Sequence, residues 1–279
     1  MRICGVGDNV IDRYLHCDLM FAGGNALNFA VFGRQAGAQA AYLGITGNDI
    51  PAGVIRHALC AEGVDISRVR INESFNALSQ IDIDADGNRF FVGSVPPPYQ
   101  LRLSEADLAW LADFDLLHTS DYSGLEAQLP QLAACAPLSF DFGSRDDAWA
   151  EPLLRWVQVA TFSRSGSAPQ AIERLIANAH AAGVATVLVT QGADGAIISH
   201  RGERHRQPAL PTQIVDSLGA GDAFIATLLV KLGQGSTLAD AANDAALASA
   251  RVCERLGAFG SGVPLTPLPP LPQEAKQQP

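Results

Sequence analysis

The chain has 279 residues, of which 48% are hydrophobic and 17% are charged, and its formal net charge is −10. This length and composition predict one large, compact domain rather than a disordered chain. The negative charge excludes a broad surface for nucleic acid or for anionic membranes, because binding to phosphate groups of that kind needs a basic face.

Strands and helices alternate through the first part of the chain. The expected strands are residues 3–6 and 40–44, and the expected helices are residues 29–35 and 51–62. The polar residues Gly7-Asp8-Asn9 directly follow the first strand. Open α/β sheets bind their ligands beyond the carboxyl ends of the strands, so these residues are candidates for a site.

Residues 71–95 interrupt this alternation. Two runs of alternating polar and apolar residues, 77–84 and 89–92, flank an Asp86-Gly87 pair. This pattern predicts a β-hairpin with a tight turn. Inside an α/β sequence, such a hairpin is expected to leave the main sheet and to cover one face of the molecule.

The alternation returns at Ser104, which is a plausible helix cap. The later expected strands are residues 114–118, 138–142, 157–162, 184–190 and 196–200, and the later expected helices are 168–182 and 238–256. Residues 264–279 are rich in proline, glutamine and lysine and predict a disordered tail. The whole pattern predicts an α/β fold with a doubly wound, mostly parallel sheet and helices on both faces.

The five cysteines are scattered along the chain and form no Cys-x-x-Cys pair, which excludes the usual zinc and thioredoxin-like motifs. We expect buried free thiols in a reducing cytoplasm. No apolar run near the N-terminus is long enough for a signal peptide, and none elsewhere is long enough to span a membrane. The expected location is therefore cytoplasmic.

The strongest functional signal is the segment from Asp216 to Asp222, with the sequence Asp-Ser-Leu-Gly-Ala-Gly-Asp. It lies between an apolar run at 213–215, expected to be a strand, and a helical run at 223–232. Glycines let the backbone approach a ligand closely, and the N–H groups at a helix start favour negative charge. A carboxylate there is placed to accept the proton of a hydroxyl that attacks a phosphoryl group. The alternative is an ordinary glycine turn, in which Asp222 only complements the helix dipole.

A second glycine-rich element, Gly23-Gly24-Asn25 with Asn28 after it, leads into the first helix. The two elements, in this order and at this separation, resemble the PfkB/ribokinase family of carbohydrate kinases. The similarity covers residues 1–263. It implies a ribokinase-like kinase domain over that range, with a small β lid formed by about residues 13–21 and 71–95.

Within this family the chain is most similar to the fructoselysine 6-kinases. The similarity is carried by Gly7-Asp-Asn-Val-Ile-Asp12, Gly23-Gly-Asn-Ala-Leu-Asn28, Ala109-Trp-Leu-Ala-Asp-Phe-Asp115 and Ser139-Phe-Asp-Phe142. It implies ATP-dependent transfer of the γ-phosphoryl group to a terminal hydroxyl of a fructosamine such as fructoselysine. Asp121, Asp141 and Asp146, at or after strand ends, would suit an ammonium-bearing substrate, although solvated carboxylates are the default explanation.

The resemblance also implies roles for single residues. Asp222 matches the catalytic base, expected to stay ionised at the helix N-terminus, and the backbone of Gly219, Ala220 and Gly221 matches the anion hole. The implied substrate-binding residues are Asp8, Asn9, Asp12, Gly24, Asn25, Asn28 and Arg89. The implied nucleotide-binding residues are Thr190, Gly192, Gly195 and Gly221. Turns, a helix cap and solvated side chains remain the alternatives for these two sets.

The implied cofactors are ATP and Mg²⁺. Asp216 matches a position near a monovalent-cation site, which leaves a dependence on K⁺ open. The implied partner is a small-molecule sugar or fructosamine, with no nucleic acid and no membrane. Exposed strand edges invite pairing, so a homodimer through the lid is expected.

Two departures from the family pattern concern the nucleotide. The Asn-x-x-Glu element that many members carry is missing from residues 161–167, and Ala246 lies where some relatives place an asparagine near adenine. Two other functions therefore stay open: a kinase for another small sugar or nucleoside, and an inactive sugar-binding regulatory protein. A nicotinamide-dependent oxidoreductase is disfavoured, because Val10 stands where the dinucleotide fingerprint needs glycine.

Overall fold

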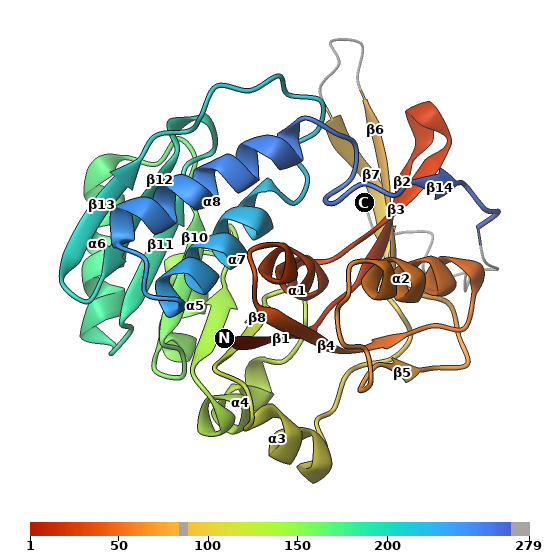
Figure 1. The fold of residues 1–279 in the computed structure, drawn as a ribbon, viewed down its shortest axis with the longest axis horizontal. Coiled ribbons are helices and arrows are strands. Elements are labelled where there is room, and N and C mark those ends of the chain that lie inside the picture. The colour runs from red at the N-terminus through yellow and green to blue at the C-terminus, as the bar shows by residue number, and fades with distance from the viewer. Residues whose placement is uncertain (84–88, 269–279) are drawn as a thin grey trace.

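The computed structural model describes residues 1–83 and 89–268 (Figure 1). Within this part of the chain, the main sheet has the strand order β13-β12-β11-β10-β9-β8-β1-β4-β5. Its strands are β1 (Arg2–Gly7), β4 (Gln39–Thr46), β5 (Arg70–Ile71), β8 (Leu116–Ser120), β9 (Leu138–Asp141), β10 (Val159–Ser163), β11 (Thr186–Thr190), β12 (Ala196–His200) and β13 (Glu203–Gln207). The strands from β5 to β11 pair in parallel, whereas β12 and β13 are added antiparallel at one edge.

Helices cover both faces of this sheet, as the sequence predicts. One face carries α1 (Asn25–Gln35), α2 (Ile50–Ala61), α7 (Ala220–Gly233) and α8 (Leu238–Cys253), and the other carries α3 (Glu105–Leu111), α4 (Leu129–Cys135), α5 (Asp147–Leu154) and α6 (Pro169–Ala181). Successive residues of a strand pack on opposite faces of the sheet: Ile3 packs with the first group of helices and Cys4 with the second. None of the helices in the described ranges is long and apolar enough to cross a membrane.

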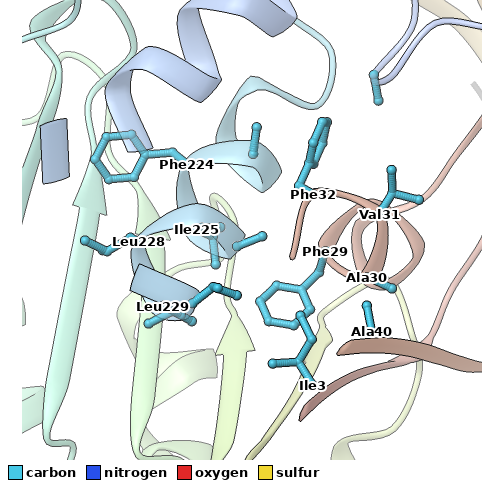
Figure 2. Close-up of a cluster of buried hydrophobic side chains, with 14 of the residues drawn as sticks. Ile3, Phe29, Ala30, Val31, Phe32, Ala40, Phe224, Ile225, Leu228 and Leu229 are labelled. Atoms are coloured by element: carbon cyan, nitrogen blue, oxygen red, sulfur yellow. The ribbon is translucent and has the colours of Figure 1, made fainter. Parts of the chain in front are cut away.

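Buried side chains between α1 and α7 fix the positions of these two helices. Phe29 of α1 and Ile225 of α7 are buried in the same cluster as Ile3 of β1, as Figure 2 shows. Close packing of such side chains leaves helices little freedom to shift. The N-terminal ends of α1 and α7 are therefore fixed relative to each other.

A second, smaller sheet forms the lid, with the order β14-β3-β2-β6-β7 in the described residues. Its strands are β2 (Val10–Tyr14), β3 (Leu19–Gly23), β6 (Leu78–Ile83), β7 (Arg89–Val95) and β14 (Val263–Pro264). The lid thus begins at Val10 rather than at about residue 13. Asp12, an expected substrate-binding residue, lies on lid strand β2.

Two other segments differ from the sequence-based expectation. Residues 213–215 form no strand: Ile214 is 70% exposed, and the N–H of Val215 donates to the carbonyl of Cys253 (2.7 Å) in helix α8 rather than to a strand. Order continues past residue 263, because Pro264 pairs with β3 and Arg13 Nη1 donates to the carbonyl oxygen of Thr266 (2.8 Å). The expected hairpin turn, 84–88, and the expected tail beyond residue 268 lie outside the described residues.

Candidate active site

The strand order of the main sheet reverses at β1. The strand that follows β1 along this sheet, β4, lies on one side of it, and the strands from β8 to β11 lie on the other side. Such a reversal marks the place where open α/β sheets bind ligands, beyond the carboxyl ends of the strands. Asp8 follows β1, Asp121 follows β8, and Asp141 ends β9, so three carboxylates reach this edge.

Asp222 comes to the same place from the N-terminus of α7. Gly219 caps this helix with a φ of +80°, and a Cβ there would lie 2.5 Å from the Cβ of Ala258, so only glycine fits. The helix has no side-chain cap, and the first N–H groups of a helix have no partner within it. A Cβ on Gly221 would meet no atom within 4 Å, which leaves this backbone open to a ligand. This arrangement suits an anion.

Two amides hold the carboxylate of Asp222. Asn28 Nδ2 donates to Oδ2 (2.7 Å) and Asn25 Nδ2 donates to Oδ1 (2.9 Å). Burial raises the pKa of Asp222 to about 7, the Asn28 bond opposes this rise, and the charges of Asp141 and Asp8 add to it. The expectation that the helix N-terminus keeps Asp222 fully ionised is therefore wrong near neutral pH, because desolvation outweighs the favourable donors.

Asp141 is the second carboxylate that Asn25 contacts. Asn25 Nδ2 donates to its Oδ2 (2.8 Å), and Thr161 Oγ1 (2.7 Å) and the N–H of Gly143 (3.0 Å) donate to its Oδ1. Burial raises the pKa of Asp141, and these three donors lower it. Sequence reasoning placed Asp141 at a strand end but gave no sign that it shares a partner with Asp222.

His118 completes this cluster and was not foreseen. It lies on β8 with 1% exposure, and its Nε2 is 2.9 Å from Asn25 Oδ1. Burial lowers the pKa of His118 to about 3, so the imidazole is neutral. In the sequence it is one residue of an expected strand with no motif around it, so no local signal marked it.

Asp8 connects the first strand to helix α1. Its carboxylate accepts from the backbone N–H groups of Asn25 (2.6 Å) and Ala26 (3.2 Å), and from Ser123 Oγ (2.7 Å) and Ser120 Oγ (3.1 Å). It therefore caps α1 from outside the helix. This contact sets the entry angle of α1 and hence the place of Asn25 and Asn28.

Asn9 and Gly24 support the same junction. Asn9 Nδ2 donates to Tyr42 Oη (2.8 Å) and to the carbonyl of Ile45 (2.7 Å), so its amide nitrogen is engaged within the protein. Gly24 has a φ of +114°, and a Cβ there would lie 2.6 Å from Asn9 Cα. The close approach of the segment after β1 to the start of α1 therefore explains both Asn9 and Gly24 without a bound substrate.

Asp12 lies on lid strand β2 and is 4% exposed. A Cβ on Gly23 would lie 2.3 Å from its Oδ2, so the glycine makes room for the carboxylate. The side chain of Arg89, expected at the substrate, lies outside the described part of the chain.

The expected nucleotide stretch lies at the carboxyl end of β11. Thr190 Oγ1 donates to the carbonyl of Phe162 (3.3 Å), and Gly192 takes a φ of +61°. A Cβ on Gly195 would lie 2.0 Å from the carbonyl oxygen of Gln207, so the β12–β13 hairpin itself requires glycine there. The stretch lies at the same edge of the sheet as Asp141. The turn before β12 by itself explains the glycine at position 195.

Where this chain lacks the Asn-x-x-Glu element of the family, Arg164 connects the end of β10 to the loop after β9 and to the start of α5. Its Nη1 donates to the carbonyl of Gly143 (3.1 Å), and its Nη2 donates to the carbonyl of Arg145 (2.7 Å) and to Asp147 Oδ1 (3.0 Å). The guanidinium thus joins the end of β10 to the loop between β9 and α5.

Asp216 links the lid to the glycine turn. Tyr14 Oη of lid strand β2 and the N–H of Gly257 (3.0 Å) donate to its Oδ2, and the N–H of Leu218 (3.0 Å) donates to its Oδ1. Its carboxylate is 5% exposed and engaged by protein donors. Among the described residues, no group of three or more acidic, histidine or cysteine side chains is placed to hold a metal ion.

Comparison with known sequences identifies the family of the chain. Residues 12–264 match the family model described as pfkB family carbohydrate kinase. The chain is 37% identical to fructosamine kinase FrlD of Bacillus subtilis (strain 168), over 95% of each protein. It is 33% identical to fructoselysine 6-kinase of Escherichia coli (strain K12), over 91% of this chain and 98% of that protein.

Solved structures share the fold. Ribokinase of Arabidopsis thaliana, complexed with ribose and ATP, superposes with a TM-score of 0.79 at 21% identity, over 92% of this chain and 94% of that one. Fructokinase of Vibrio cholerae O395, bound to fructose, ADP and calcium, superposes with a TM-score of 0.73 at 23% identity, over the same shares. These similarities establish the ribokinase-like fold.

The raised pKa of Asp222 predicts how stability depends on pH. The pKa of an aspartate in the unfolded chain is near 3.8, whereas burial raises the pKa of folded Asp222 to about 7. The native state thus gains stability from the neutral form below pH 4 and loses it as pH rises to 7. We expect Asp222→Asn to raise the melting temperature at pH 8 and to have a much smaller effect at pH 4.

Calorimetry at a series of pH values checks this prediction. The exposed Asp113→Asn is the matched control, because it removes an equal charge far from the cluster. A difference between wild type and Asp222→Asn that stays constant from pH 4 to pH 8 would contradict the raised pKa.

Proposed function

The chain belongs to the pfkB family of carbohydrate kinases, and we propose that it phosphorylates the terminal, 6-hydroxyl group of a fructosamine such as fructoselysine. The observation that carries the proposal is Asp222, held by two amides beside the open backbone at the start of α7. An ATP-dependent sugar kinase needs this pair of features: a base for the hydroxyl and an anion site for the phosphoryl group.

In the proposed mechanism, Asp222 accepts the proton of the sugar hydroxyl as that oxygen attacks the γ-phosphorus of ATP. The new O–P bond forms while the bond from the γ-phosphorus to the bridging oxygen breaks, and ADP leaves. A base works best when its pKa lies near the working pH, and burial raises the pKa of Asp222 to about 7. Asn25 and Asn28 orient the carboxylate so that its remaining lone pairs face the sugar hydroxyl.

The backbone from Gly219 to Gly221 is the proposed anion hole. Its N–H groups start α7 without a side-chain cap, so they fit a negatively charged phosphoryl group, and their dipoles stabilise the charge that develops there. Mg²⁺ bound to the ATP phosphates would neutralise part of that charge. Since the described residues offer no cluster of acidic ligands for a metal, Mg²⁺ is best held through the nucleotide and water. A K⁺ ion near Asp216 would depend on backbone carbonyls, because that carboxylate already accepts bonds from protein donors.

The proposed substrate class rests on the relatives and on local charge. The charges of Asp141 and Asp8 act on both Asp222 and Asp121. Burial raises the pKa of Asp121 to about 6, and these two charges add to the rise. Arg145 pairs with Asp121 (2.9 Å) and only partly offsets this charge. The secondary amine of a fructosamine is cationic at neutral pH and would be favoured in such surroundings.

A substrate panel tests the proposal. With Mg-ATP, we expect fast ADP release with fructoselysine and slower release with fructose, ribose or a nucleoside. The Asp222→Asn protein is the blank, because loss of a general base costs about 10²–10⁴-fold in rate. Faster turnover of a plain sugar or nucleoside would show that the substrate is not a fructosamine. ATP binding without turnover of any compound in the panel would favour an inactive, sugar-binding regulatory protein.

Gly221→Ala tests the anion hole. Its Cβ meets no protein atom within 4 Å, so we expect the unfolding free energy to stay the same or to rise by up to about 1 kcal/mol. If the phosphoryl group lies against this backbone, the new methyl group displaces it, and kcat should fall by about tenfold or more.

Gly219→Ala is the matched comparison, because its positive φ and the contact with Ala258 predict a loss of stability instead. Urea denaturation and steady-state kinetics separate the two effects. Unchanged kcat in Gly221→Ala would place the phosphoryl group elsewhere.

The lid provides a surface for a proposed homodimer. In the described residues β7 is the edge strand of the lid sheet, and it exposes Phe90 (46%), Phe91 (58%) and Val92 (50%). An edge strand with exposed apolar side chains is prone to pair with another chain. The five cysteines are free thiols, but only Cys4 is buried and Cys60 is exposed, so the expectation that all five are buried is wrong.

Sedimentation measures the assembly. We expect the wild-type protein to sediment at twice the 29.4 kDa mass of one chain. The double substitution Phe90→Glu with Val92→Lys, at two exposed positions of β7, should give monomers. Ile214→Lys, a change of an exposed residue outside the lid, should leave the dimer intact. A monomeric wild type at micromolar concentration would exclude the lid dimer.

A further inference from the structure

A line of hydrogen bonds runs from the interior of the sheet to Asp222. Ser139 of β9 lies opposite His118 of β8 in register, and Ser139 Oγ is 3.0 Å from His118 Nδ1. His118 Nε2 is 2.9 Å from Asn25 Oδ1, and Asn25 Nδ2 is 2.9 Å from Asp222 Oδ1. The same nitrogen is 2.8 Å from Asp141 Oδ2.

The chemistry of these groups determines the direction of every bond. The form of Asp222 that can act as a base is the ionised one, and ionised carboxylates only accept hydrogen bonds, so in that form the amide nitrogen of Asn25 faces Asp222 and Asp141. A half-turn of this amide would set its carbonyl oxygen against both carboxylates. The carbonyl oxygen therefore faces His118, and His118 must donate to it from Nε2.

The surroundings of His118 favour the same assignment. The ring is buried and stacks on Phe29, with centroids 4.1 Å apart and planes at 15°. Phe29 lies one turn after Asn25 on α1, so one helix holds both the ring and the amide. Because burial keeps the imidazole neutral, Nε2–H leaves Nδ1 free to accept from the Ser139 hydroxyl.

We propose that His118 is a positioning residue for the kinase reaction, whose Nε2–H holds the Asn25 amide in the orientation that aligns Asp222 with the sugar hydroxyl. The proposal rests on the assignment of Asp222 as the base. His118 does not touch the reacting atoms and acts only through Asn25. No motif used to recognise the function includes His118.

The consequence for Asp222 follows from its two donors. Asn28 fixes one carboxylate oxygen and Asn25 fixes the other, so the plane of the carboxylate needs both. Without the His118 bond the carbonyl oxygen of the Asn25 amide loses its donor, and the amide can tilt while its nitrogen still faces the two carboxylates. Bonds that all donate in one direction also strengthen one another, which favours a single arrangement of the whole line.

Nuclear magnetic resonance of the wild-type protein with ¹⁵N-labelled histidine tests the donor assignment directly. We expect His118 to carry its proton on Nε2 and to stay neutral between about pH 6 and pH 8. The His118→Gln spectrum identifies its signals. A proton on Nδ1, or an imidazolium in this range, would overturn the proposal, and this measurement needs no substrate.

A pair of substitutions tests the effect on the reaction. In His118→Gln the new amide can still donate to Asn25 Oδ1, whereas in His118→Leu the new side chain fills similar space and cannot donate. We expect His118→Leu to lower kcat by about tenfold, the value of one hydrogen bond, while the KM for the sugar changes by less than about threefold. His118→Gln should keep most of the wild-type kcat. Equal losses in both variants, or none in either, would mean that the ring serves only packing.

The test stays separate from the substrate assignment. The same comparison can be made with whichever sugar the panel shows to be turned over best. Failure of fructoselysine as a substrate leaves the expected difference between the two His118 variants unchanged. Conversely, an active fructosamine kinase with the proton of His118 on Nδ1 would keep the function and discard only the positioning role.

Discussion

Asn25 is the residue on which the site depends, because it contacts each of the groups that must be held together. Its backbone N–H donates to Asp8. Its side-chain nitrogen donates to Asp141 and Asp222, and its side-chain carbonyl oxygen accepts from His118. Carboxylates this close repel one another, and a lysine or arginine in the middle would offset that repulsion but would also occupy the site. A neutral amide gives each carboxylate a donor without adding a charge.

This arrangement explains why two glycine-rich elements far apart in the sequence act together. Asp8 caps α1 and so places Asn25 and Asn28, while the core around Phe29 holds α1 against α7 and so places Asp222. The packing of two helices thereby sets distances between polar groups at their ends. The lid joins the same framework through the contact between Tyr14 and Asp216, which connects a lid strand to the turn before α7.

The buried carboxylates of the site lower the stability of the folded protein near neutral pH. Burial raises the pKa of Asp222 to about 7 and that of Asp121 to about 6, so folding is opposed by the ionisation of both groups near neutral pH. A base poised near the working pH is useful for proton transfer, and the stability lost there is the usual trade between activity and stability. The core around α1 and α7 supplies the compensating stabilisation, because its apolar side chains are almost fully buried.

The sequence by itself determined the fold class and the family, because alternating apolar runs and the two glycine-rich elements are local patterns. It also predicted roles for Asp222, Asn25 and Asn28, which the structure brings together. It did not show that residues 213–215 leave the sheet, since an apolar run does not reveal whether a partner strand is available. His118, the bridging of Asp141 to Asp222, and the raised pKa of Asp222 arise only in the folded chain. Each depends on desolvation and on contacts between segments 93 to 197 residues apart, which no local pattern encodes.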